Sequence, residues 1–169
     1  AIASILAALD FVKDDAYISF RYAHNLVTGH GLVFNPGEYL EGITNFLWTL
    51  VIAPFEAMGL DLFQVLEIIG SALVLGILAQ LVWVSIHLMG DARRDMSHFW
   101  APLWIGTSSS LAVWSTSGME QPLAMFLPVA GAYLLWTSWD DEAETRRAAA
   151  SGVLVGLGCL TRPEIHLIG

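Results

Sequence analysis

The stretch LFQVLEIIGSALVLGILAQLVWVSIHLM, residues 62–89, decides the fold of this chain. Its ionisable side chains are Glu67, about one turn from its start, and His87, near its end. A helix of about 20 consecutive apolar residues is long enough to cross the hydrocarbon core of a bilayer. The stretch therefore predicts a membrane-spanning helix.

The composition extends this prediction to the whole chain. Of 169 residues, 56% are hydrophobic and 14% are charged, whereas soluble domains usually carry about 25% charged residues. Apolar runs at 99–116, 122–139 and 148–162 predict three further spans, and the run at 1–9 predicts the end of another. The sequence thus predicts an all-α, polytopic transmembrane helical bundle. Because the chain begins without Met and ends inside an apolar run, we expect it to be the N-terminal fragment of a larger protein.

Paired arginines predict the orientation of the bundle. Arg93 and Arg94 lie in one expected loop, and Arg146 and Arg147 lie in another. Lys and Arg in short loops favour the cytoplasmic side of a membrane. The turn 116–121 then lies outside the plasma membrane. The long loop 10–43 also lies outside if a single span connects this loop to the loop with Arg93 and Arg94.

The segment 44–60 is the weak point of this topology, because a full span there would move loop 10–43 into the cytoplasm. The segment is short, contains Pro54, and carries Glu56 and Gly59 before Asp61. Such a segment more often lies on a membrane than crosses it. We therefore predict that it lies in the interface.

The outer loop opens with DDAYISFRYAHNLVTG, residues 14–29. A carboxylate at the start and a glycine at the end are typical helix boundaries. Apolar side chains at three- and four-residue spacing form one stripe, which predicts an amphipathic helix lying on the membrane surface. The stripe consists of Tyr17, Phe20, Ala23 and Val27.

Four motifs carry a family resemblance: DDAYISFRYAHNLVTGHGLVFNPGE (14–38), EGITNFLW (41–48), WSTSGMEQPL (114–123) and LTRPE (160–164). Together they resemble polyprenyl-phosphate-sugar-dependent glycosyltransferases of the GT-C superfamily, in particular the mycobacterial-type terminal β-(1→2)-arabinofuranosyltransferases and their bacterial relatives. The resemblance implies a multi-pass enzyme of the plasma membrane. Such an enzyme transfers a sugar, with arabinofuranose as one candidate, from a polyprenyl-phosphate donor to a cell-envelope glycan or similar acceptor on the outer face.

The same resemblance implies that the acidic pair Asp14 and Asp15 is catalytic. A sugar bound to phosphate already has a good leaving group, so the reaction needs a base for the incoming hydroxyl and groups that stabilise oxocarbenium-like charge. One carboxylate as the base predicts single displacement with inversion. The second carboxylate of the pair could fix the position of the base, bind the acceptor or ligate a cation. The alternative is a helix cap with a solvated surface acid.

Glu120 and Arg162 are predicted on the same outer side. With Asp15, Glu120 could complete a site for a divalent cation such as Mg²⁺, Mn²⁺ or Ca²⁺, or it could cap the helix that begins near Pro122. Arg162 could contact the donor phosphate or anchor its span at the interface.

Three further side chains are candidate substrate contacts. Arg21 and His24 could bind phosphate, with an Asp14–Arg21 salt bridge or plain exposure as the alternative. His30 could contact the donor or acceptor, or lie on the loop surface.

Other classes are less well supported by the residues. No nucleotide-binding motif, zinc spacing or basic nucleic-acid patch is present, and the single Cys159 offers neither a disulfide nor a Cys metal site. A transporter or lipid-linked sugar flippase is the main competitor, but such proteins place ionisable groups near the bilayer midplane. A non-catalytic scaffold is the third possibility, and it leaves the paired acids unexplained.

Overall fold

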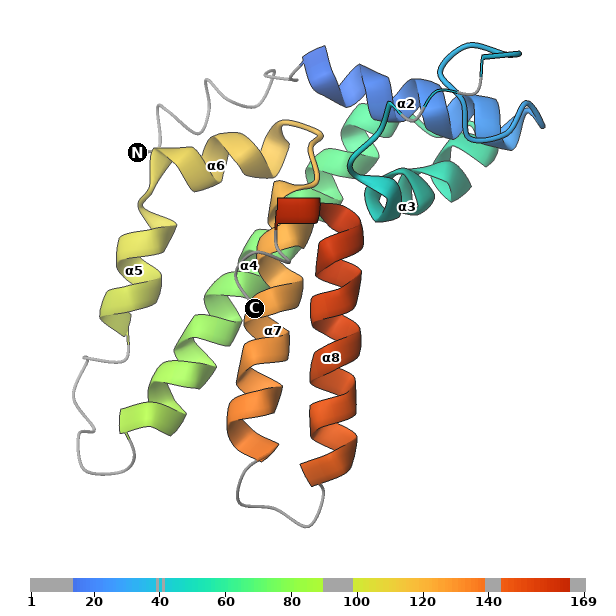
Figure 1. The fold of residues 1–169 in the computed structure, drawn as a ribbon. Helices are drawn as coiled ribbons and strands as arrows, with labels where there is room; N and C mark the ends of the chain where they lie inside the picture. The colour runs from blue at the N-terminus through green and yellow to red at the C-terminus, as the bar shows by residue number, and fades with distance from the viewer. Residues whose placement is uncertain (1–13, 39, 41, 90–98, 139–143, 165–169) are drawn as a thin grey trace.

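A computed structural model describes residues 14–38, 40, 42–89, 99–138 and 144–164 (Figure 1). In these residues the regular structure is helical and no strand occurs, so the predicted all-α class is confirmed. The helices are α2 (Asp14–Val27), α3 (Phe46–Ala57), α4 (Leu62–Met89), α5 (Trp100–Gly106), α6 (Ser109–Thr116), α7 (Gln121–Ser138) and α8 (Glu144–Thr161).

Helix α4 covers the residues 62–89 for which the sequence predicted a single long helix. Over Leu62–His87 it is long and apolar enough to cross a membrane, and among the described helices it alone meets that test. A core helix of a soluble protein is mostly buried, whereas 17% of the apolar window of α4 is buried inside this structure. The wider prediction of several spans stays a prediction.

Helices α4, α7 and α8 form a bundle in which α7 and α8 run antiparallel side by side (Figure 1). Small residues allow the helices to approach closely, as is common between helices in membranes. The Ser151 hydroxyl on α8 donates a 2.7 Å hydrogen bond to the carbonyl of Gly131 on α7. On α4, the Phe126 ring of α7 lies where a side chain at Gly76 would stand.

Helices α2 and α3 pack together across one end of this bundle (Figure 1). Ala23 of α2 meets Trp48 and Ile52 of α3 and Leu66 of α4 in a buried apolar cluster. With 12 residues, α3 is about 18 Å long, which is shorter than the ~30 Å hydrocarbon core. Its length fits the interfacial placement of segment 44–60, which stays a prediction.

The single span predicted at 99–116 is wrong, because the structure divides it into α5 and α6. At seven and eight residues, each is about 10–12 Å long and cannot cross a bilayer alone. The break falls at Thr107 and Ser108, where the Thr107 hydroxyl donates to the Trp104 carbonyl and Ser108 is extended. Hydroxyl side chains that bond to nearby backbone compete with helix continuation. Figure 1 shows α5 beside the bundle and α6 turned across its end.

Some predictions concern residues outside the described ranges. The partial span 1–9 and the loop with Arg93 and Arg94 are among them. Helix α8 begins at Glu144, not at 148, so Arg146 and Arg147 lie in its first turns and not in a loop.

The contact between α4 and α6 provides a stability test at Gly70. A Cβ added there would overlap the main-chain carbonyl oxygen of Ser115, which cannot move as a side chain can. We expect Gly70→Ala to lower the free energy of unfolding by about 1–3 kcal/mol, measured by thermal unfolding of the full-length protein in detergent.

Gly152→Ala is the matched control, because a Cβ at Gly152 on α8 meets open space. Alanine is the better helix former by about 0.8–1 kcal/mol, so this variant should be at least as stable as the wild type. Equal losses in both variants would contradict the close α4–α6 contact.

Candidate active site

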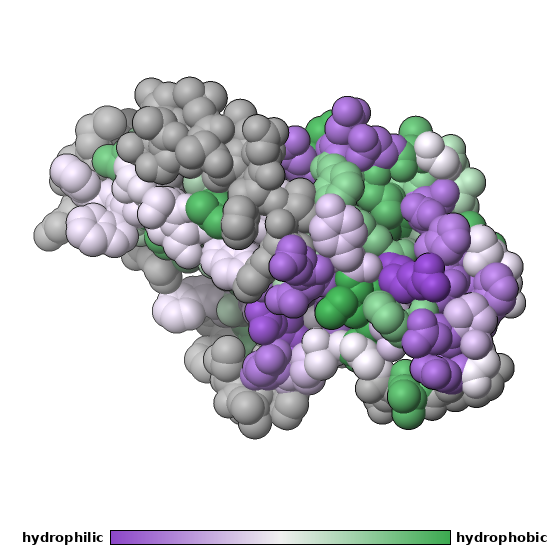
Figure 2. Space-filling model, turned by 90° about the horizontal axis from the view of Figure 1, so that it is seen from above, coloured by the Kyte–Doolittle hydropathy of each residue, from purple (hydrophilic) through white to green (hydrophobic). Residues whose placement is uncertain are grey.

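A cavity of about 600 Å³ lies at the end of the bundle that α2 and α3 cover. Figure 2 looks onto this end of the molecule and shows hydrophilic residues gathered beside hydrophobic ones. Four parts of the chain form the wall: α2, the segment leading into α3, the segment from α6 to the start of α7, and the residue after α8. The lining residues are Asp15, Ile18, Ser19, Gly42, Ile43, Thr44, Asn45, Trp114, Met119, Glu120, Gln121 and Arg162.

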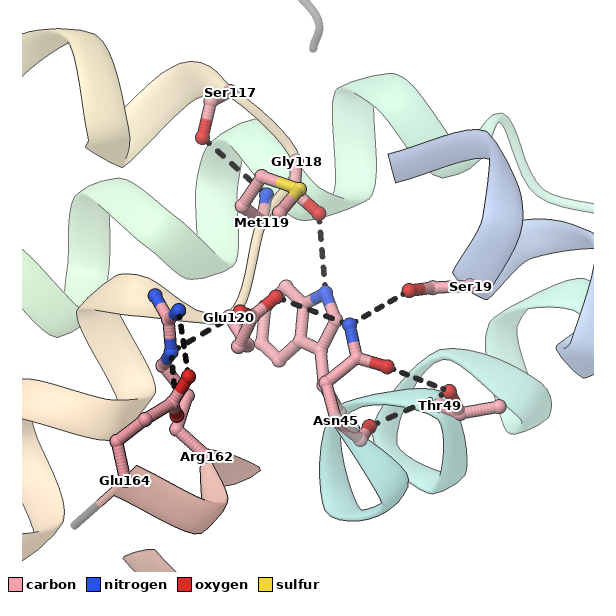
Figure 3. Close-up of polar contacts among 10 residues, drawn as sticks. Ser19, Asn45, Thr49, Ser117, Gly118, Met119, Glu120, Arg162 and Glu164 are labelled. Carbon is pink, nitrogen blue, oxygen red and sulfur yellow. Dashed lines mark hydrogen bonds and ion pairs between the residues drawn. The ribbon is translucent and has the colours of Figure 1, made fainter. Parts of the chain in front are cut away.

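Glu120 is the most deeply placed acid of this wall, with 4% of its surface exposed. Its carboxylate accepts a 3.0 Å hydrogen bond from Nδ2 of Asn45, and its Oε1 lies 3.8 Å from Nε of Arg162 (Figure 3). Its main-chain carbonyl accepts from the amide of Ala124 in the first turn of α7. This bond is the first backbone hydrogen bond of α7, while the carboxylate contacts Asn45 before α3 and Arg162 after α8.

Asn45 is a site residue that the sequence interpretation missed. It stands at the N-cap of α3, yet its side chain makes no capping hydrogen bond. Its amide nitrogen donates both to Glu120 and, at 2.8 Å, to the hydroxyl of Ser19 on α2 (Figure 3). The sequence signal was an Asn directly before an apolar helix, which is usually explained by capping alone.

The turn before Glu120 is held by Trp48. The indole Nε1 of Trp48 on α3 donates a 3.1 Å hydrogen bond to the carbonyl of Gly118. Gly118 has φ of +75°, a conformation that glycine adopts without the steric penalty of a side chain. The Ser117 hydroxyl accepts from the amide of Met119 in the same turn. The turn and α3 are thus fixed to one another beside the cavity.

Arg162 follows the last turn of α8 and lies between two carboxylates. Its Nε is 3.4 Å from Oε2 of Glu164 and its Nη2 is 3.5 Å from Oε1 of that residue, while Glu120 lies on its other side (Figure 3). The Arg162 side chain is more exposed than that of Glu120. A guanidinium in this position can bind a phosphate that enters the cavity.

The two acids of the predicted catalytic pair differ in position. Both lie in the first turn of α2, where carboxylates are favourable near the helix dipole. Both residues are exposed, but Asp15 lines the cavity and Asp14 is not part of its wall. The structure therefore brings Asp15, Glu120 and Arg162 together, as the topology predicted.

The other three candidates do not line this cavity. Arg21 donates through Nε to the carbonyl of Phe34. His24 Nδ1 lies 2.8 Å from Oε1 of Glu56 and links α2 to α3. His30 Nδ1 lies 2.9 Å from the Thr28 hydroxyl, and these two residues are neighbours in one turn.

The predicted cation site would have two carboxylate ligands from the protein. Among the residues that the structure describes, no group of three His, Cys, Asp or Glu side chains could hold an ion. Asp15 and Glu120 offer two carboxylates at one cavity. A hard cation prefers six or more oxygen ligands, so water or substrate oxygens would have to complete its coordination.

In the described residues, the structure shows a helical bundle with one helix long and apolar enough to span a membrane, and with a polar cavity at one end that two carboxylates line. The chain is 29% identical over 178 residues to the terminal beta-(1->2)-arabinofuranosyltransferase of Mycobacterium tuberculosis and 25% identical over 185 residues to that of Corynebacterium glutamicum. Each alignment covers 94% of this chain, which confirms the predicted resemblance, but only 27% and 26% of the two relatives. The chain therefore spans about a quarter of their length.

A further relative is the Na(+)/H(+) antiporter NhaA 3 of Streptomyces coelicolor. It is 32% identical over 101 residues, which are 59% of this chain and 21% of the antiporter. No protein-family model matches the chain, and no solved structure matches it.

The Trp48–Gly118 hydrogen bond leads to a second test. Trp48→Phe keeps an aromatic ring but removes the indole donor, leaving the Gly118 carbonyl without that partner. We expect a loss of about 1–3 kcal/mol in the free energy of unfolding, measured by thermal unfolding. Trp104→Phe on α5 is the control, since Trp104 is 83% exposed and its replacement should change stability little. A loss no greater at Trp48 than at Trp104 would argue against this hydrogen bond.

Proposed function

We propose that this protein is a membrane glycosyltransferase that transfers a sugar from a polyprenyl-phosphate donor to a glycan or similar envelope acceptor. Arabinofuranose is the proposed sugar because both glycosyltransferase relatives are named for it. The observation that carries the proposal is the cavity itself. Asp15, Glu120 and Arg162 come from distant parts of the sequence and line one polar cavity at the end of a membrane-type bundle.

The chemistry assigns a role to each side chain. Asp15 accepts the proton of the acceptor hydroxyl as that oxygen forms a bond to the anomeric carbon. The bond from the anomeric carbon to the phosphate oxygen breaks, and its electron pair leaves with the polyprenyl phosphate. Attack opposite the leaving group inverts the anomeric centre. The nearby carboxylates stabilise positive charge on the sugar ring, and Arg162 binds the phosphate.

The proposed setting is the outer face of the plasma membrane, within a multi-pass bundle. Helix α4 is the proposed span that joins the cavity end to the cytoplasmic arginine loop, and α3 is proposed to lie in the interface. The phosphate of a lipid-linked donor sits at the membrane surface. A cavity at the end of the bundle is suited to such a donor, which does not have to enter the bilayer core.

A divalent cation is the second proposed feature of this site, with Asp15 and Glu120 as its protein ligands. Mg²⁺, Mn²⁺ or Ca²⁺ would neutralise charge on the departing phosphate. We expect EDTA to abolish sugar transfer and one of these ions to restore it, as measured with purified full-length protein. Full transfer after EDTA treatment would remove the cation from the proposal and leave the carboxylates as base and charge stabiliser.

The alternative function is transport, and the match to an antiporter favours it. Ion carriers place ionisable groups near the bilayer midplane. In α4 the acid is Glu67, near one end, and α7 carries no acidic or basic side chain. This distribution of ionisable side chains therefore favours sugar transfer at the membrane surface over ion transport. Sodium-dependent proton movement in proteoliposomes, without sugar transfer, would reverse this preference.

Asp15→Asn tests the proposed base. We expect kcat for sugar transfer to fall by about 10²–10⁴-fold, the usual contribution of a general base, while the isosteric amide keeps the fold intact. The assay follows transfer from a polyprenyl-phosphate arabinofuranose to an arabinan acceptor.

Asp14→Asn is the matched variant in the same helical turn. Because Asp14 lies off the cavity wall, we expect its loss to be far smaller, within about tenfold. Full activity of Asp15→Asn, or equal losses in both variants, would contradict the assignment of Asp15 as the base.

A further inference from the structure

Asn45 uses both hydrogens of its amide to join two sides of the cavity. A side-chain carboxamide has two donor hydrogens, and here one goes to the Ser19 hydroxyl and the other to the Glu120 carboxylate (Figure 3). All three residues are buried, with exposed fractions of 2% for Ser19, 9% for Asn45 and 4% for Glu120. Buried polar groups of this kind strongly prefer to keep their partners.

Ser19 connects this link to the proposed base. It lies four residues after Asp15 on α2, so the two side chains project from neighbouring turns of one helix face, and both line the cavity. A hydrogen bond that fixes Ser19 therefore also fixes the part of α2 that carries Asp15.

Glu120 connects Asn45 to Arg162 on the opposite side of the cavity. Its other carboxylate oxygen faces Nε of Arg162 at the end of α8. The chain of contacts thus runs from α2 through Ser19, Asn45 and Glu120 to Arg162. Its two ends are the proposed base and the proposed phosphate ligand.

We propose that Asn45 is a positioning residue, which sets the separation between the Asp15 side and the Arg162 side of the cavity by binding Ser19 and Glu120 at once. This inference rests on the proposed function. It assigns Asn45 no proton transfer and no phosphate binding, because its amide donors are already taken. A displacement of about 1 Å between reacting groups can reduce a rate about 10²-fold, so loss of this link should appear in turnover.

Asn45→Ala and Asn45→Asp are the first variants. Both remove the donor, and the second also places a carboxylate beside Glu120. We expect kcat to fall about 10- to 100-fold. The KM for the donor should change less than about threefold, because Arg162 remains available to the phosphate. The measurement is steady-state sugar transfer by the full-length protein, normalised to folded enzyme.

Glu120→Gln supplies the background for a double-mutant cycle. In Asn45→Asp/Glu120→Gln the new carboxamide at position 120 can donate to the new carboxylate at position 45, so the hydrogen bond is restored with its direction reversed. When position 120 is Gln, Asn45→Asp should therefore lower kcat by less than about threefold. When position 120 is Glu, the same substitution should lower kcat by about 10- to 100-fold. Equal costs in the two backgrounds would overturn the proposal.

Asn25→Ala is the matched control for loss of a buried amide. Asn25 is 3% exposed and its Nδ2 also makes two hydrogen bonds, both of 2.8 Å, to the carbonyls of Val33 and Phe34. It lies on α2 but does not line the cavity. We expect this variant to lower the Tm and leave kcat per folded enzyme unchanged. A fall in kcat as large as that of Asn45→Ala would mean that the Asn45 effect is a general loss of structure.

Thermal unfolding of the same four cycle proteins separates this inference from the proposed function. Coupling of positions 45 and 120 in Tm, together with unchanged kcat, would overturn the positioning role and leave the glycosyltransferase in place. No sugar transfer by the wild type would overturn the proposed function, and with it the role in catalysis. Absence of coupling in both Tm and kcat would overturn the Asn45–Glu120 link itself.

Discussion

The burial of the Glu120 carboxylate is the constraint on which the cavity end of the structure depends. An isolated ionised carboxylate taken out of water costs several kcal/mol unless it is paired and hydrogen-bonded. Glu120 finds its partners in Asn45 and Arg162, which precede α3 and follow α8. These helix ends must therefore converge on the start of α7, and the cavity is the space left among them.

The rest of the bundle is held by a different kind of contact. Along α4, α7 and α8 the close approaches occur at small residues, among them Gly70, Gly76 and Gly131. Hydrogen bonds between helices also occur in this body, such as that from Ser151 to Gly131, in line with the small and polar residues that join helices in membranes. The buried side-chain contacts that link α2, α3, α7 and α8 to one another lie instead at the α2–α3 end. That end is therefore the part of the molecule suited to substrate binding.

The sequence predicted those parts of the structure that local patterns determine. The start of α2 at Asp14, both ends of α4 and the start of α7 near Pro122 follow from caps, apolar length and turn residues. The break at Thr107 was missed because the count of apolar residues in 99–116 outweighed the hydroxyl run that interrupts the helix. Hydropathy measures the transfer of side chains, and it does not register their competition for backbone carbonyls.

The sequence predicted which residues of the candidate site lie together, but not the contacts between them. Charge topology placed Asp15, Glu120 and Arg162 together, and the structure brings them to one cavity. The link through Asn45 and Ser19 depends on residues 26 and 75 positions apart, and no local period encodes such a pair. For Arg21, a local period gave the wrong partner. Helical spacing indicated a salt bridge to Asp14, whereas Nε of Arg21 donates to the carbonyl of Phe34 in the loop after α2.

The charges of the cavity explain how one site can receive a phosphate and still contain a base. Asp15 and Glu120 together would repel an anionic donor, and Arg162 alone offsets one of them. Because Glu120 is paired with both Arg162 and the Asn45 amide, its charge is partly neutralised, and the wall that faces the donor is less negative than its composition implies. The second carboxylate on Arg162 belongs to Glu164, which is exposed, so an entering phosphate can replace it without uncovering a buried charge. In the proposed reaction Glu120 stays paired with Arg162 and Asn45, while the exposed Asp15 carboxylate accepts the proton of the acceptor hydroxyl.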